Sequence, residues 1–320
     1  MHLAFWLRAT AAATALVALA VPVALAQDEA PPLRPGPAGR AVDGATAGAR
    51  RLSDVPYGLD LRHRMDVYVP AGAMPGAVPQ PPGRGAPVVF MVHGGAWSLG
   101  DKAHGRVVHA KVGRWVPRGL VVISVNYRLV PAVNVLQQAH DVATALATAQ
   151  RHAAQWGADA SRFILMGHSA GAHLVALLNA HPALAHTAGA RPWLGAVALD
   201  GAALNVPRVM AARHPPLYDR VFGDDPAFWR AASPNHAVQG NPAPAPPFLL
   251  VCSTRRTDGA CAQAQALADR VHAQGGRAEV LPQPLSHGDI NARLGEEGDY
   301  THAVERFMAS LDPEVARLLR

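Results

Sequence analysis

The sequence predicts an α/β domain with a mostly parallel central sheet that is flanked by helices. Short, continuous apolar runs such as 87–92 and 121–125 are typical of strands that are buried on both faces of a parallel sheet. These runs alternate with longer segments whose apolar residues recur at helical spacing. In addition, Gly167-His168-Ser169-Ala170-Gly171 joins one apolar run to a run of small residues. That arrangement is typical of a sharp strand-to-helix turn that exposes a serine hydroxyl above the sheet.

The chain begins with a predicted secretory signal peptide over residues 1–26. A single charged residue, Arg8, precedes an apolar run over 9–20, and Ala24-Leu25-Ala26 fits the small-residue cleavage pattern ahead of polar residues. An uncleaved membrane anchor is the alternative, although the apolar run is short for a bilayer span. We therefore expect a periplasmic or secreted protein without a stable membrane span after cleavage. The sequence does not indicate an oligomeric state.

Residues 27–50 are rich in Pro, Gly and Ala and predict a flexible leader, and residues 51–320 predict the α/β domain. Within that domain the strands are expected in order at 65–70, 87–92, 121–125, 162–166, 194–199, 248–252 and 278–281. The helices are expected at 135–155, 170–180, 260–273 and 300–311. Residues 203–246 interrupt this alternation and are rich in Pro, Arg and aromatic residues. They predict a small cap over the carboxyl-terminal edge of the sheet.

The charge pattern argues against nucleic acid as a partner. The formal net charge is +6, and all basic residues except Lys102 and Lys111 are Arg, which is the pattern of a GC-rich genome. These residues are scattered and form no basic tract. The chain has no His-Glu-x-x-His, Cys-x-x-Cys or phosphate-binding glycine motif, so no metal or cofactor is expected.

Ser169 is the candidate nucleophile, and a serine hydroxyl needs a base that is oriented by an acid. The chain has 16 histidines, but His287 alone directly follows the last predicted strand, and catalytic groups in this architecture follow the carboxyl ends of strands. The alternative for His287 is a histidine of a surface loop. We predict that His287 is the base.

Asp258 is the predicted acid, because it lies between serine and histidine in the chain and follows the strand at 248–252. Asp200, at the end of the strand 194–199, is the competing candidate. Cys252 and Cys261 are nine positions apart, and in an oxidising compartment we expect a disulfide that would fix the loop bearing Asp258. Two buried free thiols are the alternative.

The peptide His93-Gly94-Gly95-Ala96-Trp97 directly follows a buried strand and predicts an oxyanion hole. The natural donors are the backbone N–H groups of Gly95, Ala96 and Ala170, the last being the residue after the nucleophile. We expect His93 to shape this loop by hydrogen bonding and Trp97 to pack against it rather than bind substrate.

These motifs together resemble the α/β-hydrolase superfamily, within the hormone-sensitive-lipase-like and feruloyl-esterase-like carboxylesterases. The resemblance extends from about residue 57 to 308 and rests on 65–70 as the entry strand, on His93 to Trp97, on Asn126-Tyr127-Arg128-Leu129 with Pro131, on 167–171, and on Ala232-Ser233-Pro234. It implies a structural role for Asp141. The chain departs from the family at the acid loop, where 253–258 reads Ser-Thr-Arg-Arg-Thr-Asp without the glycine that is common there.

The sequence therefore predicts an exported serine carboxylester hydrolase that acts on a small-molecule ester without a cofactor. The alternative is an amidase of the kynurenine-formamidase type, because those enzymes share the HGGxW motif, although the export signal argues against an intracellular role. A non-catalytic hydrolase fold is a third reading, against which the intact Ser169, His287 and oxyanion glycines argue. The acyl length and the alcohol are not indicated by the sequence.

Overall fold

The computed structural model describes residues 48–72, 85–201, 203–240 and 243–320. The predicted signal peptide and residues 27–47 of the predicted leader lie outside the described residues. The predicted leader extends two residues too far, because the first strand already begins at Ala49. After Ala49, its residues are only half-buried or exposed, so it lacks the continuous apolar run that marks the buried strands.

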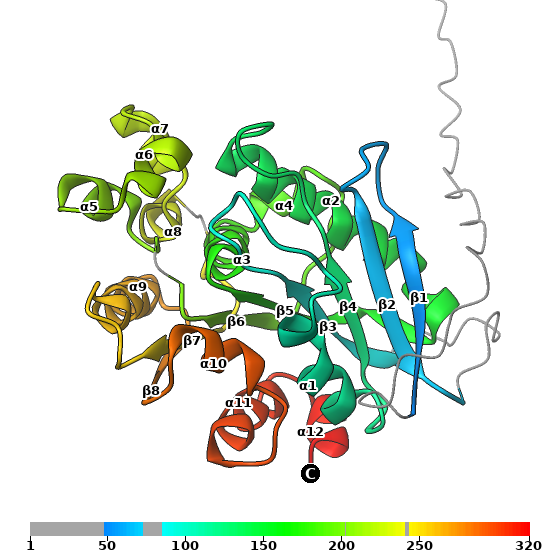
Figure 1. Ribbon diagram of the computed structural model, residues 1–320. Helices are drawn as coiled ribbons and strands as arrows, with labels where there is room; N and C mark the ends of the chain where they lie inside the picture. The colour runs from blue at the N-terminus through cyan, green and yellow to red at the C-terminus, as the bar shows by residue number, and fades with distance from the viewer. Residues whose placement is uncertain (1–47, 73–84, 202, 241–242) are drawn as a thin grey trace, which may run out of the picture. The chain divides into compact units, whose positions relative to one another are not determined.

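The predicted fold class is confirmed by an eight-stranded sheet in the order β1-β2-β4-β3-β5-β6-β7-β8 (Figure 1). β1 and β2 pair antiparallel at one edge, β2 is also antiparallel to β4, and the remaining pairs are parallel. The strands are β1 Ala49–Pro56, β2 Arg64–Pro70, β3 Ala86–Val92, β4 Val121–Val125, β5 Ala158–His168, β6 Gly195–Leu199, β7 Phe248–Ser253 and β8 Ala278–Gln283.

Alternate residues of the central strands enter two separate hydrophobic cores. In β3, Val88 and Phe90 contribute to the core on one face of the sheet, whereas Val89 and Met91 contribute to the core on the other. Phe90 is in register with Ile123 of β4 and with a β5 residue of the same core. Because both faces are covered, these strands read as continuous apolar runs rather than alternating ones.

Helices cover both faces of the sheet. α2, α3 and α9 contribute to the core that contains Phe90, and α1, α11 and α12 contribute to the core that contains Met91. The helices are α1 Gly105–Trp115, α2 Val135–His152, α3 Ala170–Ala180, α4 Ala183–His186, α5 Val206–Ala211, α6 Pro216–Phe222, α7 Pro226–Ala231, α8 Pro234–Ala237, α9 Ala260–Ala273, α10 His287–Ala292, α11 Asp299–Ala309 and α12 Pro313–Leu318. No helix in these described ranges is long and apolar enough to cross a bilayer.

The predicted helices are found, with small shifts at their ends. α3 and α9 match their expected ranges, and α2 is shorter because 153–156 turns into a 3-10 helix that ends at Gly157 in the left-handed region. α1 was not predicted, because its buried positions include Lys111, which interrupts the apolar pattern. α5, α6, α7 and α8 lie in the region that was predicted to form a cap, and they gather at one side of the sheet (Figure 1).

Candidate active site

Ser169 lies on a sharp turn between β5, which ends at His168, and α3, which begins at Ala170. Its φ of 54° is in the region that residues with a side chain rarely adopt, so the turn is strained. The Ser169 N–H donates to Leu199 O at 3.0 Å and ties the turn to the end of β6. A Cβ on Gly171 would lie 2.2 Å from Val92 O, so only glycine permits this close approach of α3 to β3.

The loop after β3 lies directly against this turn. A Cβ on Gly94 would come within 3.0 Å of Ser169 Cβ, which places the two backbones side by side. Ala96 and Trp97 adopt φ values of 53° and 57°, so the loop holds a left-handed conformation at two non-glycine residues. In the part of the chain that the structure describes, no backbone acceptor is found for the N–H groups of Gly95, Ala96 and Ala170.

His93 shapes this loop as predicted. Its ring is fully buried and stacks on Tyr127 with 4.6 Å between ring centroids, and the Tyr127 hydroxyl donates to His93 O at 3.0 Å. Burial lowers the pKa of His93 to about 4, so the ring is neutral at physiological pH. It is therefore part of the loop's support and not a general base.

Trp97 packs the same loop onto the cap, again as predicted. Its side chain is 3% exposed, and its ring meets those of Tyr218 and Phe222 of α6 edge to face at 5.9 and 5.2 Å. The indole N–H donates to His173 Nδ1 at 3.2 Å. The cap and the candidate oxyanion loop are thus joined by one aromatic cluster.

His287 begins α10, and its partner is Asp200. Its Nδ1 donates to Asp200 Oδ2 at 2.5 Å, and Asp200 Oδ1 accepts the Ser253 N–H at 2.8 Å. The Asp200 side chain is 0% exposed, whereas that of His287 is 40% exposed. Burial by itself would raise the pKa of the Asp200 carboxyl, but hydrogen bonds from His287 and Ser253 and the charge of Arg256 outweigh it and lower the pKa.

The prediction that Asp258 orients His287 is wrong in this structure. The Asp258 side chain is 51% exposed and its carboxylate binds the Arg256 guanidinium, with Nε at 2.9 Å from Oδ1. Among the described residues, the only carboxylate joined to His287 is that of Asp200. The reason is position: Asp200 directly follows β6 beside the Ser169 turn, whereas Asp258 lies five residues beyond the end of β7, after the chain has turned outward.

His168 joins His287 to the Ser169 turn. The two rings lie 4.5 Å apart between centroids, and His168 Nε2 donates to His287 O at 2.9 Å. Burial and the neighbouring His287 lower the pKa of His168 to about 3, so the ring is neutral. No hydrogen bond from Ser169 Oγ to His287 is found in the described part of the chain, and such contacts are often long when no substrate is bound.

Two further side chains, which the sequence did not single out, hold α10. Lys111 of α1 donates from Nζ to Asn291 O at 2.6 Å and to Asn291 Oδ1 at 3.0 Å, and the Tyr300 hydroxyl donates to Ile290 O at 2.8 Å. Burial lowers the pKa of Lys111 to about 7. Only their burial beside α10 marks these residues, and burial is a tertiary property.

The predicted disulfide is present between Cys252 at the end of β7 and Cys261 in α9, with Cα atoms 5.1 Å apart. It closes the loop that carries Arg256 and Asp258. Asp141, for which the resemblance implied a structural role, binds Arg128 through both carboxylate oxygens at 2.8 and 2.6 Å and lies 3.1 Å from His63 Nε2.

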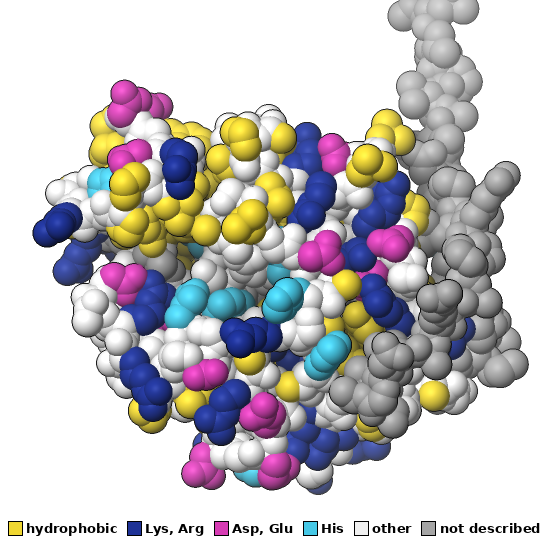
Figure 2. Space-filling model, viewed as in Figure 1, with side chains coloured by type: hydrophobic (Ala, Val, Ile, Leu, Met, Phe, Trp, Pro, Cys, Tyr) yellow, Lys and Arg dark blue, Asp and Glu magenta, His cyan; other side chains and the backbone are white. Residues whose placement is uncertain are grey.

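A pocket of about 430 Å³ lies between the cap and the Asp258 loop. Its lining includes Tyr218, which contacts Trp97, and Asp258, which binds Arg256, but it does not include Ser169 or His287. Figure 2 shows histidine side chains in a band across this face, below the hydrophobic side chains that gather over the cap.

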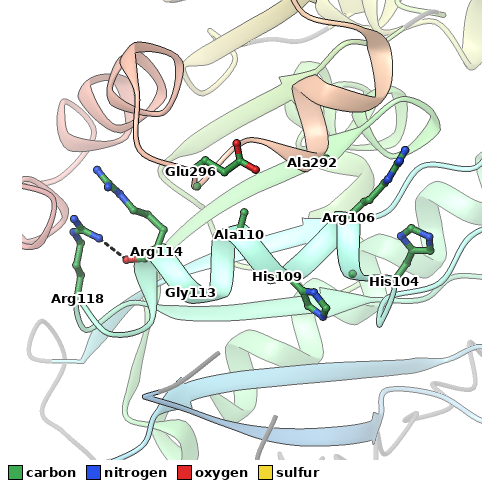
Figure 3. A pocket seen from close by; sticks show the side chains of 11 residues that line it. His104, Arg106, His109, Ala110, Gly113, Arg114, Arg118, Ala292 and Glu296 are labelled. Atoms are coloured by element: carbon green, nitrogen blue, oxygen red, sulfur yellow. Dashed lines mark hydrogen bonds between the residues drawn. The ribbon is translucent and has the colours of Figure 1, made fainter. Parts of the chain in front are cut away.

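A separate pocket of about 780 Å³ lies beside α1 (Figure 3). His104, Arg106 and His109 of the α1 region line it together with Glu296, but none of the predicted site residues does. Among the described residues, no group of three or more His, Cys, Asp or Glu is placed to hold a metal ion.

Comparisons with known proteins find relatives that are named as esterases. Residues 65–188 match the family model described as BD-FAE. Over 223 residues the chain is 33% identical to "Esterase LipQ" of Mycobacterium tuberculosis, which covers 63% of this chain and 48% of that protein. It is 32% identical over 125 residues to "Probable isoprenylcysteine alpha-carbonyl methylesterase ICME" of Oryza sativa, covering 39% of this chain and 27% of that one. The chain thus spans less than half the length of these relatives.

Solved structures match over most of the chain. The crystal structure of "ESTERASE B from Lactobacillus Rhamnosis (HN001)" superposes with a TM-score of 0.66 at 20% identity, covering 85% of this chain and 88% of that chain. A truncated carbohydrate esterase from gut microbiota has a TM-score of 0.68 at 17% identity, covering 87% and 99%. At these identities the likeness shows the shared fold.

Proposed function

We propose that this chain, which matches the BD-FAE family model over residues 65–188 and has the fold of solved esterase structures, is an exported serine carboxylester hydrolase that forms an acyl-enzyme on Ser169. The observation that carries this proposal is the His287–Asp200 pair beside the strained Ser169 turn. A buried carboxylate that holds one imidazole nitrogen leaves the other nitrogen to act as a base towards a serine. The relatives named as esterases support the same chemistry.

In the first half of the reaction, His287 Nε2 takes the Ser169 hydroxyl proton while Oγ forms a bond to the ester carbonyl carbon. The tetrahedral intermediate then collapses, its C–O bond to the alcohol breaks, and His287 returns the proton to the leaving oxygen. In the second half, a water molecule attacks the acyl-enzyme, His287 takes its proton, and the acid leaves as Ser169 Oγ is reprotonated. Asp200 holds the ring through Nδ1 and stabilises its positive charge in both halves.

The developing oxyanion accepts hydrogen bonds from the N–H groups of Gly95, Ala96 and Ala170. The close approach of Gly94 to Ser169 Cβ supports this assignment, because the start of the glycine loop lies beside the residue that carries the reacting oxygen. The aromatic cluster around Trp97 fixes the loop before substrate arrives, so little reorganisation is needed during the reaction.

We propose that the pocket between the cap and the Asp258 loop receives one arm of the ester. Its lining combines apolar side chains such as Val209 and Tyr218 with polar ones such as Gln263. Such a lining suits a small organic ester. Export is supported by the signal-like residues 1–26 and by the Cys252–Cys261 disulfide, since disulfides persist in oxidising compartments.

The test is a p-nitrophenyl ester series from acetate to octanoate on the wild type and on Ser169→Ala, with Ser310→Ala as the matched control. We expect Ser169→Ala to lose about 10⁴-fold or more in kcat and Ser310→Ala to keep the wild-type rate. A phosphonate probe should add once, at Ser169. N-formylkynurenine is included as the amide, and a preference for it over every ester would overturn the ester assignment. For export, the mature protein should begin at Gln27.

A further inference from the structure

The side chain of Arg256 lies against the Asp200–His287 pair. Its Nη1 is 3.1 Å from Asp200 Oδ2, 3.1 Å from Asp200 O and 3.3 Å from His287 Nδ1. The guanidinium is only 15% exposed, although it belongs to a loop that is otherwise at the surface. A cation is therefore built into the part of the site that orients the candidate base.

The Arg256 contact completes the hydrogen bonding of the Asp200 carboxylate. Oδ1 accepts the Ser253 N–H, and Oδ2 accepts both His287 Nδ1 and Arg256 Nη1. A fully buried carboxylate is costly unless several donors hold it in its charged form. The second contact, to Asp200 O, also fixes the backbone at a residue whose φ is 54°.

The contact between Arg256 and the imidazole is not a hydrogen bond. Nδ1 carries the proton that is donated to Asp200, so it has no lone pair to accept from Nη1. Arg256 thus approaches the ring only because both groups share Oδ2. Its effect on the ring is indirect, because it holds Asp200 Oδ2 in position to accept the hydrogen bond from His287 Nδ1.

Asp258 holds Arg256 from the other side. The Asp258 carboxylate accepts hydrogen bonds from Arg256 Nε and Nη2, which is the fork geometry that arginine offers to a carboxylate. The Cys252–Cys261 disulfide closes the loop that carries both residues. Asp258, which the sequence predicts as the acid, therefore binds Arg256, and Arg256 binds Asp200, the acid that the structure shows.

We propose that Arg256 is a positioning residue for ester hydrolysis: it holds Asp200 Oδ2 against His287 Nδ1, and Asp258 in turn holds Arg256. This inference rests on the proposed function, because it assigns a role within the same site. Arg256 acts through Asp200 and forms no bond with the substrate.

The test compares Arg256→Ala, Arg256→Lys and Asp258→Asn with the wild type in p-nitrophenyl acetate hydrolysis. Arg255→Ala is the matched control, because Arg255 is the exposed neighbour on the same loop. We expect Arg256→Ala to lower kcat by about 10- to 100-fold with KM within about threefold, because a charge-assisted hydrogen bond is removed. Arg256→Lys should restore part of kcat, since lysine supplies the charge without the fork. Asp258→Asn should lose less than about fivefold.

Added methylguanidinium should raise the rate of Arg256→Ala but not that of Arg255→Ala. A purely structural role would not respond to a small cation that refills the site. If Arg256→Ala does not fold, Arg256→Lys decides the question: partial loss of kcat at unchanged KM supports the proposal. An unchanged kcat in a folded Arg256 variant, or an equal loss in Arg255→Ala, overturns it.

A second readout separates this inference from the proposed function. The proton NMR signal of the His287 Nδ1–H, shifted downfield by its hydrogen bond to Asp200, should be present in the wild type and lost or displaced in Arg256→Ala. If Ser169-dependent ester hydrolysis is absent but the signal changes in this way, only the proposed function fails. If hydrolysis is present and neither kcat nor the signal responds to Arg256→Ala, only the positioning role fails.

Discussion

Replacing Asp200 by Asn tests most directly which carboxylate orients His287. The substitution keeps the shape of the side chain but removes the negative charge that lies 2.5 Å from Nδ1. It also gives the position an N–H₂ group, which can bind His287 in the wrong tautomer. Asp258→Asn is the matched control, since it makes the same chemical change on the candidate that the sequence favoured.

The expected magnitude follows from burial. Asp200 is 0% exposed, and removing one partner of a buried charge pair costs about 3–5 kcal/mol. The imidazole becomes positively charged in the transition state, so the lost charge pair raises the activation barrier. At 1.36 kcal/mol for each factor of ten, a barrier increase of that size corresponds to a loss of about 10² to 10⁴ in kcat. The Asp258 side chain is 51% exposed, so its pair is screened by solvent and its loss should lower kcat by less than about fivefold.

The assay is steady-state hydrolysis of p-nitrophenyl acetate, with kcat and KM determined separately for both variants. Near-ultraviolet circular dichroism confirms that each variant is folded. A larger loss in folded Asp258→Asn than in folded Asp200→Asn would refute the reasoning. So would wild-type kcat in Asp200→Asn.

Four further predictions concern stability and specificity. In the folded protein the pKa values of His93, His168 and His173 are lowered to about 4, 3 and 4. The unfolded chain therefore binds more protons than the folded protein below about pH 6.5. In urea titrations, the free energy of unfolding should fall between about pH 6.5 and pH 4, by up to about 3 kcal/mol per histidine. The lowered pKa of Lys111, about 7, predicts that stability rises from pH 7 towards 10 in urea titrations, and that Lys111→Met removes this rise. Reduction of the disulfide should lower the unfolding free energy by about 2–3 kcal/mol, and an unchanged denaturation midpoint would contradict this. Val209→Trp should fill the cap-side pocket and lower kcat/KM for octanoate but not for acetate; equal loss on both esters would place the acyl arm elsewhere.

Much of the architecture could be predicted because burial leaves a local signature. The strands around Phe90 and Ile123 are apolar at every position except Ser124, since both faces of a parallel sheet are covered. β1 and α1 were missed for the converse reason. The side chains of β1 are only partly buried, and the buried face of α1 includes Lys111, whose charge breaks the apolar period.

The residues of the candidate site likewise divide into those that a local sequence signal predicts and those that it does not. The Ser169 turn and the His93 to Trp97 loop were predictable because close backbone approach demands glycine at fixed positions, as the contact of Gly171 with Val92 O shows. His287 was predictable from its place after the last strand. Each of these signals is a property of a short stretch of chain.

The sequence by itself therefore determined the fold class and the nature of the nucleophile, its candidate base and the glycine loop. Only the tertiary structure decided that Asp200 is the partner of His287 and that Asp258 holds Arg256 instead. Both carboxylates follow parallel strands and lie between serine and histidine in the chain, so no local pattern separates them. What separates them is the sheet order, which places the end of β6 next to the Ser169 turn, and the outward course of the loop after β7.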